Sequence, residues 1–199
     1  MLQTPLKIVA LSGGLQRPSR TLVLVEELIE GIAQAIPVES RVIEIGNLVP
    51  QFGAVLYRPQ LPAAVEEALV ALESADLVIA AASPVFRGAY SGLFKHFLDF
   101  VHHDALIDTP VLLAATGGSE RHALVIDHQL RPLFSFFQSH TLPIGVYATD
   151  RDFENYQVRS ELLRARIALA VSRALPVLRQ LQPQAERAAA PRPQLHAVA

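Results

Sequence analysis

A polar segment near the N-terminus carries more hydrogen-bond donors than a simple turn requires. It follows the apolar run 8–11 and leads into an apolar-periodic segment that begins at Thr21. Its donor-bearing side chains are Ser12, Gln16, Arg17, Ser19 and Arg20. Such groups, placed where a helix begins and its first backbone N–H groups are free, favour an anion such as phosphate. The segment therefore indicates a phosphate site, while a tight turn with a helix cap and solvated arginines accounts for the same residues.

Two later loops share this composition. Loops 84–92 and 116–119 each follow an apolar stretch and combine glycine with polar side chains. Glycine lets a backbone approach a ligand closely. The carboxyl edge of a parallel sheet is where such folds bind ligands, so three loops of this kind favour a ligand site over three plain turns. The first loop matches neither GxxxxGK[ST] nor GxGxxG, which favours a mononucleotide phosphate over a P-loop or a dinucleotide fingerprint.

The hydrophobic pattern predicts five strands that alternate with helices. The predicted strands are 6–12, 38–45, 75–84, 109–118 and 142–148. The predicted helices are 20–35 with Ser19 as N-cap, 63–74, 93–101, 120–138 and 155–181, with a loop over 46–62. Strands that are apolar throughout are typical of a sheet covered on both faces. We therefore expect an α/β fold, a three-layer sandwich with a five-stranded parallel sheet, in a domain of residues 1–181, followed by a mobile Ala/Pro-rich tail, 182–199.

Composition excludes several classes of protein. The chain has 199 residues, 51% of them hydrophobic, yet no apolar run approaches the length of a membrane span, and the N-terminus lacks the features of a signal peptide. We expect a cytoplasmic protein that binds no membrane. Without cysteine there is no disulfide, thiolate metal site or cysteine nucleophile. A formal net charge of −2 is not that of a nucleic-acid binder or of a very acidic electron carrier.

The sequence contains no hydrolytic signature. We find no HExxH, no GxSxG and no paired-carboxylate motif. Adjacent His102 and His103 would point different ways on a helix, and His122 and His128 are six residues apart and do not share a helical face. We therefore predict no metal site and no catalytic acid or base.

Three segments resemble the signature regions of the NADPH-dependent FMN reductase family, whose fold is flavodoxin-like. They are LSGGLQRPSRT (11–21), ASPVFRGAYSGLFKHFLDF (82–100) and AATGGSERHALVIDHQLRPLF (114–134). They look closest to the reductases that serve two-component alkanesulfonate and methanesulfonate monooxygenases. The likeness spans about residues 7–157. The second segment is the most specific, because it combines Ser83-Pro84, an aromatic residue, Ser91-Gly92, Lys95 and Asp99 at the family's spacing.

The resemblance implies a role for each loop. Ser12, Gln16, Ser19 and Thr21 would hold the FMN phosphate, and Pro84, Val85, Phe86 and Arg87 would line the ribityl chain and the flavin edge. Thr116, Gly117, Gly118 and Ser119 would bring backbone groups to the isoalloxazine ring, while Arg17, Arg20 and Arg87 are candidates for the 2′-phosphate of NADPH. The family usually has Gly-Ser-x-Arg in the first loop. Here Gly14, Leu15 and Gln16 stand before Arg17, so one hydroxyl is lost, the charge is displaced, and looser phosphate binding is expected.

By resemblance, the protein would reduce FMN by hydride transfer from the nicotinamide of NADPH to flavin N5 and supply reduced FMN to a partner flavin-dependent monooxygenase of sulfur metabolism. A flavin-centred transfer of this kind needs binding and orientation rather than a side-chain acid or base. Two alternatives share the fold: a reductase of quinones, azo dyes or chromate that retains FMN, and a non-enzymatic flavodoxin-like electron carrier. Retention of the flavin on purification and oxidation of NADPH would separate them.

Pro132 lies inside the predicted helix 120–138 and cannot donate to the carbonyl of His128. Either a proline kink or a π-bulge would accommodate it. In the sulfonate-linked reductases this helix resembles an oligomer-interface helix with an inserted residue, which implies that His128 is the insertion. The apolar stretch 130–137 is broad for one buried face. We therefore expect a homodimer or homotetramer with this helix at the interface.

Overall fold

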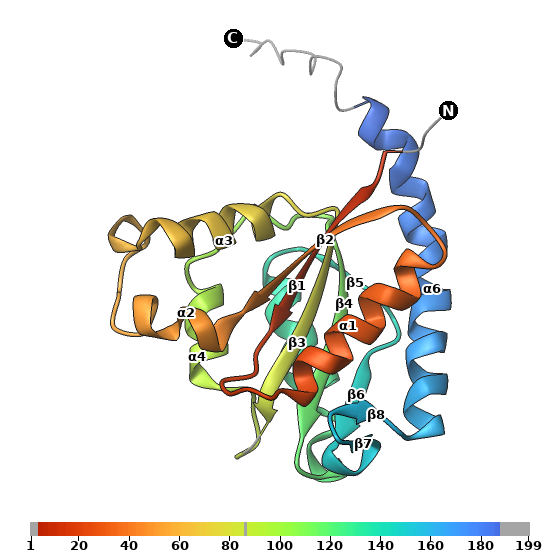
Figure 1. Cartoon of the computed structure of the whole chain (residues 1–199). Coiled ribbons are helices and arrows are strands. Elements are labelled where there is room, and N and C mark those ends of the chain that lie inside the picture. Colours follow the sequence, from red (N-terminus) through yellow and green to blue (C-terminus); the bar gives the residue numbers. More distant parts are fainter. Residues whose placement is uncertain (1–3, 86, 188–199) are drawn as a thin grey trace.

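The computed structural model describes residues 4–85 and 87–187 (Figure 1). Its main sheet is parallel, in the order β2-β1-β3-β4-β5, and β6 also pairs with β4. The strands are β1 (Leu6–Ser12), β2 (Val38–Glu44), β3 (Leu77–Val85), β4 (Pro110–Gly117), β5 (His140–Thr141) and β6 (Val146–Thr149). This is the flavodoxin-like strand order, in which the direction of winding reverses between β1 and β3. The predicted fold class is confirmed.

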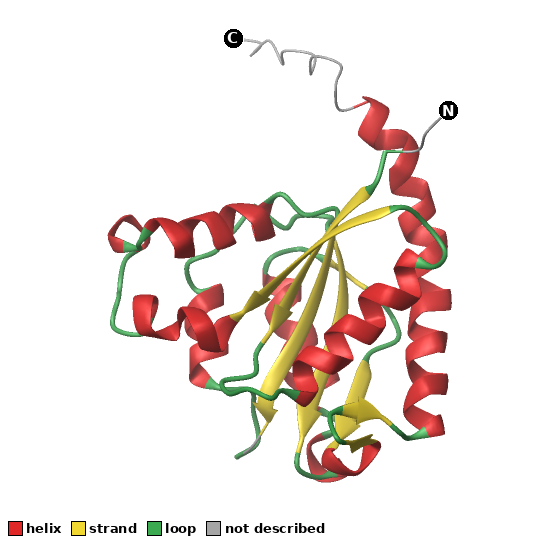
Figure 2. Cartoon of the chain, in the orientation of Figure 1, coloured by secondary structure: helices red, strands yellow, loops and turns green. Residues whose placement is uncertain are grey.

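Helices cover both faces of this sheet, which gives the three predicted layers (Figure 2). On one face lie α1 (Arg20–Ala33) and α6 (Glu161–Arg187). On the other lie α2 (Ile45–Phe52), α3 (Ala63–Glu73), α4 (Gly92–Leu98) and α5 (Arg131–Phe136). In β1, Ile8 and Ala10 pack toward α1 and α6, while Val9 and Leu11 pack toward the opposite layer. The strands are apolar throughout because successive side chains enter two different cores.

Several predicted boundaries agree with the structure. β1 has the predicted limits, and α1 begins immediately after Ser19. The Ser19 hydroxyl oxygen accepts a hydrogen bond from the backbone N–H of Leu22 at 3.2 Å, which confirms the predicted N-cap. Among the described residues, no helix is both long and apolar enough to cross a membrane.

The prediction of an unbroken loop over 46–62 was wrong. It contains most of α2 and a 3₁₀ turn at Arg58–Gln60. Pro50 lies inside α2 and removes one backbone hydrogen bond, but Ile45 and Phe52 at the two ends of the helix are both completely buried. Burial of these two side chains outweighs the low helix propensity of Gly46 and Pro50.

The fifth strand and the start of the last helix also differ from the prediction. Of the predicted strand 142–148 only the second half is formed, as β6, while β5 lies just before it; Pro143 lies between β5 and β6 and cannot donate to a sheet ladder. Residues 150–158, predicted in part as helix, form a 3₁₀ turn and a small hairpin of β7 (Phe153–Glu154) and β8 (Gln157–Val158). Asn155 and Tyr156 have φ of 49° and 57°, as a tight hairpin turn requires. α6 continues to Arg187, beyond the predicted end at 181, and residues 188–199 of the predicted tail lie outside the described residues.

The predicted helix 120–138 is three elements rather than one. A 3₁₀ turn covers Glu120–His122, a π-helical turn covers Ile126–Leu130, and α5 follows. The backbone N–H of Arg131 donates to the carbonyl of Ile126, five residues back, as in a π-helix. Pro132 lies in the first turn of α5, where a missing donor costs least. Of the two accounts of Pro132, the π-bulge is therefore confirmed, and it contains His128.

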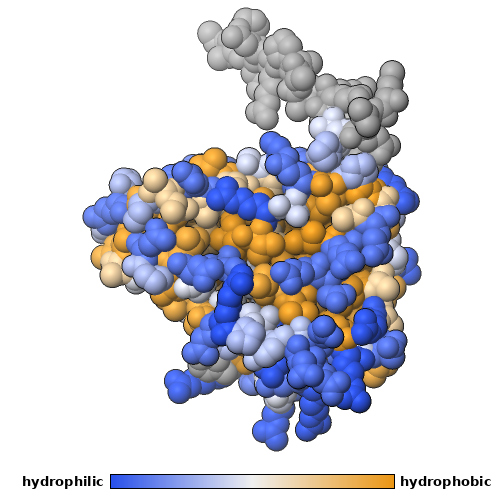
Figure 3. Space-filling view, viewed as in Figure 1, coloured by the Kyte–Doolittle hydropathy of each residue, from blue (hydrophilic) through white to orange (hydrophobic). Residues whose placement is uncertain are grey.

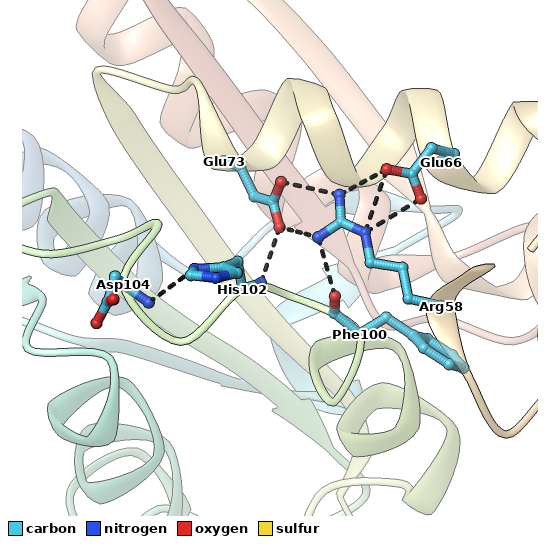
Figure 4. Close-up of polar contacts among 6 residues, drawn as sticks. All are labelled: Arg58, Glu66, Glu73, Phe100, His102 and Asp104. Atoms are coloured by element: carbon cyan, nitrogen blue, oxygen red, sulfur yellow. Dashed lines mark hydrogen bonds and ion pairs between the residues drawn. The ribbon is translucent and has the colours of Figure 1, made fainter.

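An arginine network fastens the layer of α3 and α4 (Figure 4). The Arg58 Nη2 atom donates to Glu66 Oε1 at 2.6 Å and to Glu73 Oε2 at 3.0 Å, and its Nη1 donates to the carbonyl of Phe100 at 3.1 Å. Glu73 also accepts the backbone N–H of His102 at 2.8 Å. One guanidinium thus joins the 3₁₀ turn, α3 and the segment after α4. Its hydrogen bonds hold the pKa of Glu66 below the ordinary value.

Replacing Arg58 by Gln is expected to lower the free energy of unfolding by about 2 kcal/mol near neutral pH, because Glu73 and the Phe100 carbonyl lose charge-assisted bonds. The Glu66 part of this stabilisation exists above the unfolded pKa of that carboxyl and is lost as pH falls through its lowered folded pKa. Urea unfolding at pH about 7 and about 3.5 checks this, with Arg179→Gln on the exposed face of α6 as control. A wild-type advantage that is as large at the lower pH would contradict the prediction.

Candidate active site

Three loops at the carboxyl ends of β1, β3 and β4 surround a cavity of about 440 Å³. Its size lies within the range of small-molecule sites. The α1 helix points its N-terminus into it, and the first turn of α1 contains no acidic side chain. In Figure 3, hydrophilic side chains gather at this lower end of the molecule, below β3 and β4. The lining residues are Gly14, Leu15, Gln16, Pro18, Ser19, Arg20, Thr21, Ser83, Pro84, Thr116, Gly117, Gly118 and Asp150.

A hollow between α1 and α6 is larger, about 560 Å³, but it is lined by the flanks of two helices. Backbone N–H groups inside a helix are already bonded, so this hollow offers side chains alone. The cavity at the carboxyl edge is the better ligand site, because strand ends and a helix N-terminus meet there.

Buried hydroxyl groups join the three loops. The Thr21 and Thr116 hydroxyl oxygens lie 2.7 Å apart, and the Thr116 hydroxyl donates to that of Ser83 at 3.1 Å. Thr21 is in the first turn of α1, Ser83 is near the end of β3 and Thr116 is near the end of β4. The three residues are 2%, 9% and 7% exposed. Because unpaired buried hydroxyls are costly, this chain of hydrogen bonds holds the loops in one arrangement.

Gly13 allows the first loop to lie directly on β3. Its backbone N–H donates to the carbonyl of Ala81 at 2.8 Å. A Cβ atom at this position would lie 2.8 Å from the backbone nitrogen of Ser83, closer than real Cβ contacts. The first glycine of the polar segment therefore serves a close approach between the first loop and the backbone of β3.

Tyr147 on β6 holds the third loop. Its hydroxyl donates to the carbonyl of Ser119 at 2.7 Å, and a Cβ atom on Gly117 would lie only 2.3 Å from that hydroxyl oxygen. Burial raises the pKa of Tyr147, so the phenol remains a donor at neutral pH. The lack of a side chain at Gly117 thus leaves room for the Tyr147 hydroxyl.

The arginines of the first loop are already paired. Arg17 binds Glu44 of β2 through two nitrogens, one at 2.8 Å, and its side chain is 62% exposed. Arg20 lies 3.3 Å from Asp150 and 5.4 Å from the centre of the Tyr156 ring. The α1 end of the cavity therefore offers backbone N–H groups and neutral side chains more than free cations.

Comparison with known proteins identifies the family. The model of the NADPH-dependent FMN reductase family matches residues 6–154. The chain belongs to this family. It is 61% identical over 176 residues to the NADH-dependent FMN reductase SfnF of Pseudomonas fluorescens, which covers 88% of this chain and 94% of that one. It is 59% identical, with the same coverage, to an FMN reductase (NADPH) of Pseudomonas aeruginosa. A solved oxidoreductase from Corynebacterium diphtheriae is 32% identical, with a TM-score of 0.78 over 90% of this chain and 98% of that one.

This member of the family is thus an oxidoreductase that uses a flavin and a nicotinamide nucleotide. The predicted residues that line its cavity are Gln16, Ser19, Arg20, Thr21, Pro84, Thr116, Gly117 and Gly118. They come from all three loops, so the expectation that distant segments meet at one edge is confirmed.

Other predicted residues lie elsewhere in the reductase. Arg17 is bound to Glu44 and is not part of the lining. The side chain of Val85 is 2% exposed and packs in the core, and Ser12 is 1% exposed. Arg87 is exposed with a φ of 54°, and Ser119 lines a neighbouring cavity instead. Phe86 lies outside the described residues.

Sequence reasoning missed Ser83 and Asp150. Ser83 ends an apolar run immediately before Pro84, and its polarity inside a strand was an available signal. Asp150 follows β6, so a fourth strand end contributes to the cavity. The sequence there, ATDRD, is polar at a strand terminus in the same way as the first three loops.

His102, His103 and Asp104 form an exposed cluster outside this site. Their potential ligand atoms lie within 4.8 Å of one another. The argument that adjacent histidines diverge on a helix does not apply, because both follow α4 in a turn and their rings stack with centroids 4.5 Å apart. His102 Nδ1 accepts the backbone N–H of Asp104, and His103 Nε2 lies 3.1 Å from Asp104 Oδ2. The absence of a metal site stays a prediction.

The hydroxyl chain can be tested by a double-mutant cycle on Thr21 and Thr116. Thr116→Val is expected to lower the free energy of unfolding by about 1–2 kcal/mol, since Thr21 and Ser83 both lose a partner. Thr21→Val should cost less, because Thr116 keeps Ser83. The double variant should cost less than the sum of the two by about 1 kcal/mol, as measured by urea unfolding. Additive effects would show that the two hydroxyls are not coupled.

Proposed function

We propose that this protein reduces FMN with a nicotinamide dinucleotide and releases the reduced flavin to a partner flavin-dependent sulfonate monooxygenase in the cytoplasm. The observation that carries the proposal is a cavity that offers a helix N-terminus and neutral donors to a phosphate, while Arg17 and Arg20 are paired with carboxylates. Such a site recognises a phosphate monoester without a free cationic clamp, which suits a flavin that leaves after reduction.

The order of the lining residues supports a placement of FMN with its phosphate at the α1 end. Gln16 and Ser19, with the free N–H groups of α1, would hold the phosphate. Ser83 and Pro84 would lie along the ribityl chain, and Gly117 and Gly118 would bring backbone groups to the ring. The Thr21 hydroxyl, expected from the sequence to bind phosphate, is engaged with Thr116 and has a positioning role.

Bound flavin would supply N5 as the hydride acceptor, and the protein would supply orientation and exclusion of water. The hydroxyl chain keeps the three loops in register, and Tyr147 holds the third loop through the Ser119 carbonyl. Asp150 is the acidic residue among the described lining residues, and it lies 3.3 Å from Arg20 in an ion pair. None of these groups needs to gain or lose a proton for hydride transfer.

The nucleotide is proposed to be NADPH, on the family's name. The two Pseudomonas relatives are named for NADH and for NADPH, so both nucleotides belong in the assay.

The test is NADPH and NADH oxidation by thoroughly desalted protein under anaerobic conditions, with and without FMN. Without FMN, oxidation should stop at or below enzyme equivalents; with FMN, a many-fold excess should be reduced.

Riboflavin, which lacks the phosphate, should require a concentration about tenfold higher than FMN for the same rate, if the α1 N-terminus recognises the phosphate. If added FMN changes nothing while a quinone sustains turnover, the flavin is a resident cofactor and the release of reduced FMN is wrong. If neither nucleotide is oxidised, the result favours the electron carrier.

We also propose that two or more copies associate through the segment 120–138. Leu124 and Phe136 are 62% and 69% exposed, and His128 and Pro132 are exposed between them at intervals of four residues. Leu162 of α6 is 84% exposed and borders a cavity of about 460 Å³ together with Ala123 of this segment. Large apolar side chains gathered in this way are typical of a surface covered by another protein.

Phe136→Asp is expected to shift the protein toward the monomer, because a buried unpaired carboxylate opposes association. Light scattering coupled to gel filtration measures the mass. The matched control is Tyr57→Asp, an aromatic residue that is 66% exposed near the 3₁₀ turn Arg58–Gln60, for which no change is expected. A wild type that is monodisperse at the monomer mass would overturn this interface.

A further inference from the structure

A second, smaller cavity adjoins the proposed flavin site. Its volume is about 250 Å³, and it shares Gly118 with the larger one. Two loops form it: one continues from β4 through Ser119 and Glu120 to Arg121, and the other follows β6 with Thr149 and Arg151. The larger cavity is also bordered by Asp150 of the second loop, so the two cavities are continuous along both loops.

Two arginines of this cavity are not bound by a side chain of the part of the chain that the structure describes. Among the described residues, none forms an ion pair or side-chain hydrogen bond with Arg121 or Arg151, and both side chains are exposed. Of the three arginines that the resemblance made candidates for the 2′-phosphate, Arg17, Arg20 and Arg87, the first two form ion pairs with carboxylates.

The acidic residues around Arg151 are themselves engaged. Asp150 pairs with Arg20, and Asp152 accepts both the backbone N–H and the hydroxyl of Thr149, at 2.7 and 2.9 Å. Glu120 is the remaining carboxylate on the cavity wall. The side chains that line the cavity thus carry two guanidinium groups and one carboxylate.

Both walls are held in place by contacts already described. Tyr147 fixes the carbonyl of Ser119, and the capping box of Thr149 and Asp152 fixes the loop that bears Arg151. A site that is ordered before its ligand arrives loses less entropy on binding.

We propose that Arg121 and Arg151 receive a phosphate of the nicotinamide dinucleotide. The inference rests on the proposed function: a nicotinamide that meets the flavin near Gly117 and Gly118 must place its attached ribose and phosphates within one nucleoside's reach. The planar guanidinium is suited to phosphate, and two of them match a dianionic or bridging group. The phosphate is either the pyrophosphate, common to NADH and NADPH, or the 2′-phosphate, present on NADPH alone.

The test compares Arg121→Gln, Arg151→Gln and the double variant with the wild type at saturating FMN. Each single change is expected to raise the KM of the nucleotide about tenfold with little change in kcat, and Arg151→Lys should recover much of the loss. Arg179→Gln on α6 is the matched control and should change neither constant. Added salt should raise the KM of the wild type and have little effect on the double variant.

The two nucleotides distinguish the two phosphates. A rise in KM for both NADH and NADPH assigns the arginines to the pyrophosphate, and a rise for NADPH alone assigns them to the 2′-phosphate. Unchanged KM values for both nucleotides, in variants with wild-type melting temperature, would overturn the inference and leave FMN reduction standing. Calorimetric binding of NADP⁺ and NAD⁺ needs no turnover. If the wild type oxidises neither nucleotide, the proposed function fails, and equal binding by wild type and double variant then also refutes the phosphate site.

Discussion

Burial of both faces of the parallel sheet is the constraint from which the rest of this structure follows. Successive side chains of β1 and β3 enter opposite cores, so neither face can hold a ligand. The strands must then end in polar groups at an edge, and the carboxyl edge also receives the N-terminus of α1. Ser83 and Thr116, almost fully buried at that edge, are polar because this is where the apolar layers stop. The same hydroxyls that satisfy one another hold the loops in register.

The arginines at the two ends of this edge differ in whether carboxylates bind them. At the α1 end, carboxylates of β2 and of the loop after β6 bind Arg17 and Arg20. At the other end, Arg121 and Arg151 remain exposed on a cavity wall. On the two proposals, a phosphate at the α1 end would meet a helix N-terminus and neutral donors, and one beside Arg121 and Arg151 would meet full positive charges. This division matches a protein whose flavin leaves and whose dinucleotide must be captured anew in every cycle.

The sequence predicted the features that local pattern determines. The limits of β1, the Ser19 cap and the three loops followed from apolar runs bounded by glycine and polar residues. The prediction failed where contacts between residues far apart in the sequence determine the structure. α2 forms in spite of Pro50 because Ile45 and Phe52 are completely buried, and no local signal reports this. The ion pairs of Arg17 and Arg20 were not predicted for the same reason, since Glu44 and Asp150 are far away in sequence and adjacent only in the fold.

The π turn at Ile126–Leu130 relates the packing of the segment 120–138 to the wall of the site. Pro132 cannot donate to the carbonyl of His128, and the chain instead pairs Arg131 with Ile126. The widened turn leaves His128 exposed while Ile126 and Leu130 stay buried against the sheet. The same segment begins near Ser119, which Tyr147 ties to β6 beside the cavity. A second copy that covered Leu124 and Phe136 would therefore pack on a segment continuous with the loop that forms one wall of the site. Self-association at this surface would then bear on the shape of that wall, because only the 3₁₀ turn Glu120–His122 and residues 123–125 separate Ser119 from the π turn.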